Sequence, residues 1–152
     1  MELTDADRAI LTVMQKDATL SLRDIAERVA MSQSTVWRRI QDLEARGVIA
    51  RRVTLLDPAR AGMGVCVFVQ VNLRAHDLET RKGFERMVAA CPEILNCYAV
   101  TGGFDYTLII RARSVEAFET LLMERILAHP GVANSASQIA LREVKHETAL
   151  PL

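Results

Sequence analysis

Apolar residues in the first fifty positions recur every three or four residues, which is the spacing of short amphipathic helices. Three such stretches follow one another. Each begins after a hydroxyl side chain that can cap a helix, namely Thr4, Ser21 and Ser32. The third stretch ends at Gly47, which suits a helix C-terminus. The pattern therefore predicts three helices, with a short break between the second and the third.

After position 47 the pattern changes from helical to mixed. Residues 48–56 favour β structure, and residues 57–64 hold one proline and two glycines, as a linker does. Strands are then predicted at 65–73, 94–101, 105–113 and 132–144, with helices at 77–91 and 114–128. A βαββαβ order of this kind forms a four-stranded antiparallel sheet with both helices on one face. The fold class is α+β, with domains at 1–56 and 65–152 joined by the linker 57–64.

One face of this predicted sheet has no helix of its own to cover it. We expect that face to present six side chains: Cys66, Phe68, Gln70, Cys97, Thr107 and Ile109. A half-apolar exposed face usually marks an interface. The sequence therefore predicts at least a homodimer, formed through the C-terminal domain.

The second and third helices, separated by a short break, have the arrangement of a helix-turn-helix. The third begins with hydroxyl, amide and guanidinium groups, which suit contacts with base edges and phosphates in a DNA major groove. Gln33, Ser34 and Arg38 are the predicted base contacts. Thr35, Trp37 and Arg39 are expected to position the DNA backbone or to brace the fold. The full predicted DNA-binding set is Ser32, Gln33, Ser34, Thr35, Trp37, Arg38, Arg39, Arg51 and Arg52.

The charge distribution supports DNA binding. The whole chain has 19 basic and 19 acidic residues, but residues 20–52 hold seven arginines and four carboxylates, a local charge of +3. Arg51 and Arg52 fall where a wing would reach phosphates. The alternative is a helical packing unit with solvated arginines, in which Asp42 pairs with Arg38 or Arg46 one turn away.

Three segments resemble the Lrp/AsnC (feast/famine) family of transcription regulators: residues 24–49, 100–106 and 144–152. The resemblance covers essentially the whole chain. It implies a winged helix-turn-helix followed by a ferredoxin-like domain, in dimers that often assemble into octamers. It also implies an amino acid or close relative as effector, bound near residues 101–106 at a subunit interface.

The residues of this hairpin suggest how such an effector is held. Glycines let a ligand approach backbone N–H groups, and a carboxylate at Asp105 can hold an α-ammonium group. The alternative is a plain tight turn, since glycine and aspartate are common there. The predicted effector set is Tyr98, Thr101, Gly102, Gly103, Phe104, Asp105, Ser137 and Gln138.

Nothing in the sequence predicts catalysis, a cofactor or a metal site. His76, His129 and His146 are scattered, and the three cysteines contain no C-x-x-C pair, as expected of reduced thiols in a cytoplasmic protein. The strongest apolar run, Val65–Val71, contains Gln70 and is too short to span a membrane, and the acidic N-terminus does not resemble a signal peptide.

Two other functions fit the same architecture. One is a sirohaem decarboxylase-like enzyme, which would need histidine and arginine side chains around a tetrapyrrole. A retained tetrapyrrole would give a strong visible absorption band. The other is a metabolite-binding module that does not bind DNA, but this leaves residues 32–39 and their local positive charge unexplained.

Overall fold

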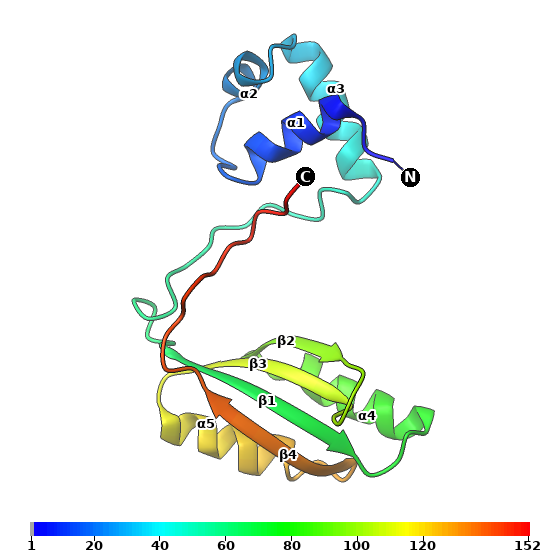
Figure 1. The fold of residues 1–152 in the computed structure, drawn as a ribbon, viewed down its shortest axis with the longest axis vertical. Helices are drawn as coiled ribbons and strands as arrows, with labels where there is room; N and C mark the ends of the chain where they lie inside the picture. The colour runs from blue at the N-terminus through cyan, green and yellow to red at the C-terminus, as the bar shows by residue number, and fades with distance from the viewer. Residues whose placement is uncertain (1) are drawn as a thin grey trace. The chain divides into compact units, whose positions relative to one another are not determined.

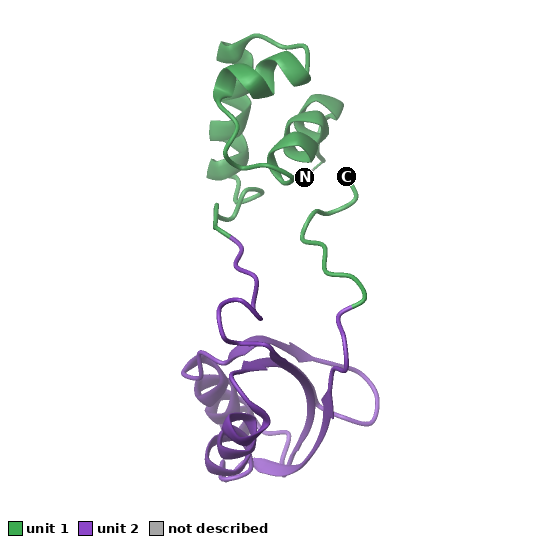
Figure 2. Cartoon of the chain, turned by 90° about the vertical axis from the view of Figure 1, so that its left-hand side faces the viewer, with its two compact units in different colours: residues 1–54, 144–152 green, residues 55–143 purple. Residues whose placement is uncertain are grey.

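The computed structural model describes residues 2–152, which fall into two compact units. One unit contains the chain up to Thr54 together with Val144–Leu152, and the other contains Leu55–Glu143 (Figure 2). The last nine residues therefore group with the first unit, whereas the sequence prediction placed them in the domain 65–152. A pair of hydrogen bonds joins this segment to the residue that follows α1. Gln15 Nε2 donates to the Leu150 carbonyl at 2.7 Å, and the Leu150 N–H donates to Gln15 Oε1 at 2.8 Å.

The first unit contains the three predicted helices: α1 (Asp5–Met14), α2 (Leu22–Arg28) and α3 (Gln33–Ala45) (Figure 1). Thr4, Ser21 and Ser32 cap them as expected, each accepting a hydrogen bond from the backbone N–H three residues on. Their apolar faces meet in a core of Ile10, Ile25, Ala26, Val36 and Ile40. Ala30, in the break between α2 and α3, has a left-handed φ of 52° that glycine adopts more easily.

The stretch 48–56 does not form the predicted β structure. It contains no strand in the described chain, and neither does the segment that follows it up to Gly64. A β-leaning segment needs a neighbouring strand to accept its backbone hydrogen bonds, and no strand of the described chain pairs with this one.

The second unit has the predicted βαββαβ order. Its strands are β1 (Val65–Leu73), β2 (Ile94–Ala99), β3 (Tyr106–Ala112) and β4 (Val132–Ile139). Its helices are α4 (Leu78–Ala89) and α5 (Val115–Leu121), and α5 continues into the π-helical turn η1 (Leu122–Ile126). The strands form one antiparallel sheet in the order β2-β3-β1-β4. β2 and β4 end earlier than predicted, at 99 and 139 rather than 101 and 144.

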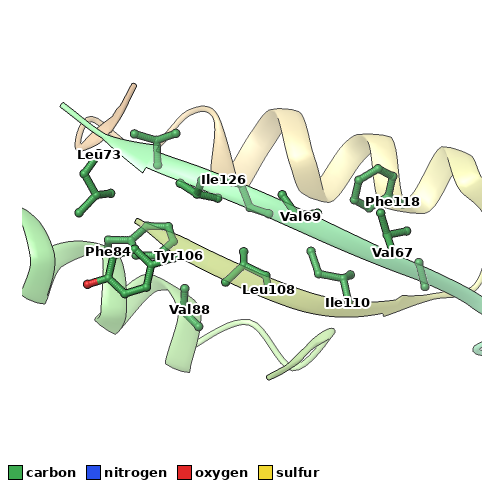
Figure 3. Packing of buried hydrophobic residues seen from close by; sticks show 13 residues of the cluster. Val67, Val69, Leu73, Phe84, Val88, Tyr106, Leu108, Ile110, Phe118 and Ile126 are labelled. Atoms are coloured by element: carbon green, nitrogen blue, oxygen red, sulfur yellow. The ribbon is translucent and has the colours of Figure 1, made fainter. Parts of the chain in front are cut away.

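The core of this unit lies between the sheet and its two helices. Both helices pack on the same side of the sheet (Figure 2). Alternate residues of β1 and β3, among them Val69 and Leu108, point towards them and are fully buried. Phe84 of α4 stacks at a tilt on Tyr106, with ring centroids 4.8 Å apart, and Phe118 of α5 completes the cluster (Figure 3).

No described helix of the second unit covers the opposite face of the sheet (Figure 2). Phe68 lies there and is 39% exposed, as predicted. Cys97 does not lie there: it pairs with the core residue Leu108 and packs against the core. An irregularity between Ile94 and Asn96 shifts the register of β2, which hydrophobic alternation could not show. Burial raises the pKa of the Cys97 thiol to about 11.

Candidate functional site

One face of α3 is exposed and carries a dense set of polar and aromatic side chains. Val36, Ile40 and Leu43 are buried on the other face of the helix. Because residues four apart lie one above the other on a helix, the exposed residues form two adjacent rows. These residues are Gln33, Ser34, Trp37, Arg38, Gln41 and Asp42, whose carboxylate pairs with Arg46. The predicted base contacts Gln33, Ser34 and Arg38 are therefore all accessible together.

Trp37 occupies the middle of this face rather than a bracing position. Its side chain is 57% exposed, which is unusual for so large an aromatic group. Trp37 and Gln41 border a cavity of about 270 Å³ between α3 and the start of α2. Sequence reasoning left Gln41 out of the site, although its position one turn after Trp37 places it in the same row.

The serine and threonine at the start of α3 serve the helix itself. Ser32 Oγ accepts the N–H of Thr35 as the N-cap and lies 2.8 Å from Thr35 Oγ1. Ser34 Oγ is 3.1 Å from Ser32 Oγ. Ser32 and Ser34 are exposed and Thr35 is half-buried. This hydroxyl cluster therefore orders the first turn of the helix that presents the exposed face.

Arg39, predicted as a DNA contact, points away from the exposed face towards α1. Its Nη1 donates to Asp7 Oδ1 at 2.9 Å and to Thr4 Oγ1 at 3.3 Å. Asp7 is only 3% exposed. Burial opposes its charge, but hydrogen bonds from Thr4 and Arg39 outweigh burial and hold the pKa of Asp7 below its ordinary value. Arg39 thus fastens α3 to α1, which is the bracing role that the sequence offered for it beside DNA-backbone contact.

The other arginines in and after α3 differ in whether they form an ion pair within the chain. Arg46 pairs with Asp42 at 2.8 Å, which is one of the two pairings considered from the sequence. Arg52 pairs with Glu44 at 2.7 Å, and Arg51 is exposed beside it in the irregular segment after α3. Arg38 has no ion-pair partner within the described residues. Of the α3 arginines, Arg38 is therefore the one available to an outside ligand.

The predicted effector hairpin joins β2 to β3, and its tip is open. Thr101, Gly102 and Gly103 are exposed, and a Cβ added at either glycine would meet no atom within 4 Å. Gly102 has φ +124°, a conformation that side-chain-bearing residues rarely adopt. Phe104 and Asp105, at the base of the hairpin, are half-buried.

The carboxylate of Asp105 is already engaged within the chain. Its Oδ2 accepts the Leu73 N–H at 2.7 Å, and its Oδ1 lies 3.5 Å from His76 Nδ1. The Asp105 N–H donates to Val71 O at 3.0 Å, and Asn72 Nδ2 donates to Gly103 O at 3.2 Å. Asp105 therefore anchors the hairpin to the end of β1, a role that competes with holding an ammonium group.

The three residues predicted to contact the side chain of the effector, Tyr98, Ser137 and Gln138, do not lie together within one chain. Tyr98 lies on the edge strand β2, whereas Ser137 and Gln138 lie on β4 at the opposite edge of the sheet. Ser137 pairs with the core-facing Val69, and Gln138 pairs with Phe68 of the uncovered face. Because successive strand residues point to opposite faces, Ser137 and Gln138 cannot line the same site on one chain.

Both halves of the chain match known sequence families. Residues 66–150 match the family described as the Lrp/AsnC ligand binding domain, and residues 3–50 match a winged helix-turn-helix DNA-binding family. The glutamate uptake regulatory protein of Zymomonas mobilis is 34% identical over 99% of this chain and 92% of its own length. The DNA-binding transcriptional activator DecR of Escherichia coli is 30% identical over 99% of both chains.

Solved structures agree over nearly the full length. The crystal structure of a transcriptional regulator from Neisseria meningitidis in complex with L-methionine has a TM-score of 0.94 and 35% identity. The match covers 99% of this chain and 97% of that one.

Proposed function

This chain belongs to the Lrp/AsnC family of DNA-binding transcription regulators, and from that premise we propose that the exposed face of α3 reads operator bases while the 101–105 hairpin helps to bind an amino-acid effector. The observation that carries the DNA-binding part is the composition of that face. An arginine can bind guanine through two hydrogen bonds, a glutamine can bind adenine in the same way, and an apolar ring can contact a thymine methyl group. Arg38, Gln33 and Trp37 offer these three chemistries side by side.

Substitution of Arg38 tests the DNA-binding proposal. Arg38→Ala is expected to cost about 1–3 kcal/mol of binding free energy on the specific operator, with a smaller loss on random DNA. Arg46→Ala is the matched control, because it removes the same charge from the end of α3, where the side chain is tied to Asp42. Fluorescence anisotropy with both DNAs measures the difference. Equal losses for the two variants would remove Arg38 from base reading.

Arg51 is proposed to contact phosphates rather than bases. It is exposed in the segment after α3, at the end of the unit that carries the reading helix. Arg51→Ala is expected to weaken specific and random DNA about equally and to reduce the salt dependence of binding. A selective loss on the operator alone would contradict this role.

We propose that the protein acts as a homodimer, assembled through the uncovered face of the sheet and able to form octamers. The half-exposed Phe68 on that face supports this assembly. A dimer presents two reading helices, so the operator is expected to be a pseudo-palindrome.

The proposed effector is an amino acid. The Neisseria relative was crystallised with L-methionine, and the open glycine tip here leaves backbone N–H groups accessible to a carboxylate. Since one chain does not bring Tyr98 and Gln138 together, the proposed site is completed by a second copy. In this proposal Asp105 holds the shape of the hairpin through its hydrogen bond with β1. Its carboxylate is not required to bind the ammonium group of the effector.

A thermal-shift screen against the twenty amino acids identifies the effector, since a ligand at 100 times its Kd adds about 2.7 kcal/mol to stability. Gly103→Val then tests the site. The new side chain enters open space within this chain, so the melting temperature should hold while effector affinity falls at least tenfold by calorimetry. Wild-type affinity in Gly103→Val would place the effector elsewhere.

The regulator names of the relatives favour this function over the sirohaem decarboxylase alternative. The purified protein is therefore expected to lack a visible tetrapyrrole band.

A further inference from the structure

A second cavity, of about 400 Å³, lies in the C-terminal unit away from the hairpin tip. It opens between the first half of α4 and the turn that leads into β4. Its lining includes Arg74, Glu79, Thr80, Gly83, Arg86 and His129. None of these residues belongs to the predicted effector or DNA-binding sets.

Two guanidinium groups border this cavity without a partner of their own. Neither Arg74 nor Arg86 forms a side-chain hydrogen bond or an ion pair with any residue that the structure describes. Six other arginines form ion pairs within the described residues: Arg23, Arg39, Arg46, Arg52, Arg60 and Arg111. Both residues are exposed at the rim of the cavity, so their charges can attract an anion that enters it. Glu79 also lies in the lining, so it reduces but does not cancel the positive charge.

His129 is held so that one ring nitrogen remains available at the cavity wall. Its Nδ1 accepts the Gly131 N–H at 3.1 Å, which leaves the proton of the neutral ring on Nε2. The ring also packs edge-on against Phe84, with centroids 6.1 Å apart. Its Nε2 and Cε1 lie beside Gly83, so Nε2–H is a fixed donor at this wall.

Gly83 keeps the wall open at a cost to the helix. It lies inside α4, where glycine destabilises a helix by about 0.5–1 kcal/mol relative to alanine. Packing does not require it: a Cβ would meet the His129 ring at an ordinary 3.7 Å and Arg86 Nη2 at 4.0 Å. Gly131 differs, because a Cβ there would lie 2.9 Å from Thr80 Cγ2. A helix glycine that the fold does not need, between His129 and Arg86, is consistent with space kept for a ligand.

We propose that this cavity binds the phosphate or carboxylate group of a small anionic metabolite. Arg74 and Arg86 supply the charge-assisted hydrogen bonds, and His129 Nε2–H supplies a neutral one. The site is separate from the proposed effector hairpin and does not depend on it.

Calorimetry on the full-length protein tests the proposal with two probes, inorganic phosphate and succinate, against sodium chloride of matched ionic strength. Saturable binding is expected for at least one probe, and the tighter probe identifies the preferred group. Arg74→Ala and Arg86→Ala should each weaken it at least tenfold, and Glu79→Gln should tighten it. Lys82→Ala is the matched control, since Lys82 is exposed on α4 but does not line the cavity. No saturable binding, or equal weakening by Lys82→Ala, overturns the proposal.

Gly83→Ala separates binding from folding. Alanine favours the helix, so the melting temperature should rise, while the added methyl group narrows the cavity and weakens anion binding several-fold. A purely structural cavity would give the stabilisation alone, and that result would count against the site. Gly103→Val should bind phosphate as the wild type does. Loss of phosphate binding in that variant would show that the two sites are one and would overturn the proposal.

Discussion

Arg38 and Arg39 have the same side chain, but they lie on different sides of α3. Successive residues of a helix are rotated by about 100°, so one points outward and the other points at α1. The buried Asp7 that receives Arg39 lies 32 residues earlier in the chain. The sequence predicted Arg38 as a base contact and Arg39 as a residue that positions the DNA backbone or braces the fold, but it could not identify Asp7 as the partner of Arg39.

The hydrogen bonds that Asp7 accepts from Thr4 and Arg39 make stability depend on pH. Asp7→Asn is expected to lower the free energy of unfolding by about 1–3 kcal/mol at pH 7, because buried hydrogen bonds to a charged group are lost. The folded-state pKa of Asp7 lies below its ordinary value of 3.8. The charged form is therefore stabilised by folding above that value, and this contribution is lost as the pH falls through the lower, folded-state pKa.

Urea unfolding at pH 7 and at pH 3 measures this effect. The difference between wild type and Asp7→Asn should shrink at the lower pH. Asp5→Asn is the control, since Asp5 lies exposed in the same first turn of α1. A difference that is constant across this range would show that the charge of Asp7 does not contribute.

At the scale of elements, capping residues and apolar spacing were sufficient to predict the helices, because a helix forms its backbone hydrogen bonds within its own segment. Capping residues and apolar spacing located all three helices of the first unit, and alternation located β1 through Val67, Val69 and Val71. The segment 48–56 has β-favouring residues but no paired strand, so propensity alone was misleading there. The hairpin could be predicted as a glycine turn. The hydrogen bonds that Asp105 forms with Val71 and Leu73 could not be predicted, because they depend on how the strands are aligned with one another.

The uncovered face of the sheet is the surface through which we propose that two copies of the chain associate. Phe68→Asp places a charge at the centre of the proposed dimer contact, where a desolvated, unpaired charge is strongly unfavourable. We expect smaller particles by light scattering, with the circular dichroism of the helices retained. Leu78→Asp is the matched control, because Leu78 is 59% exposed at the start of α4, on the helix side of the sheet. An unchanged particle size for Phe68→Asp would exclude this face as the contact.

At the scale of the molecule, the chain passes between its two units twice. It leaves the first unit after Thr54 and returns to it at Val144, so β4 is followed by a segment that belongs to the DNA-binding unit. Sequence reasoning assigned this segment to the C-terminal domain, because its partner, Gln15, is 135 residues away in the chain. The two units therefore have two covalent connections, of which only the linker 57–64 was predicted.

The attachment of the second connection depends on one side chain. Gln15 both donates to and accepts from the backbone of Leu150, while the Leu150 side chain is 67% exposed and buries little apolar surface. Gln15→Ala removes both hydrogen bonds with the Leu150 backbone. We expect the Leu150 amide to exchange with solvent at least tenfold faster, with the amides in the middle of α1 unchanged. Arg8→Ala, an exposed change on the same helix, should leave Leu150 exchange as in the wild type. Equal Leu150 exchange in Gln15→Ala and wild type would mean that contacts other than these two bonds hold the C-terminal segment on the DNA-binding unit.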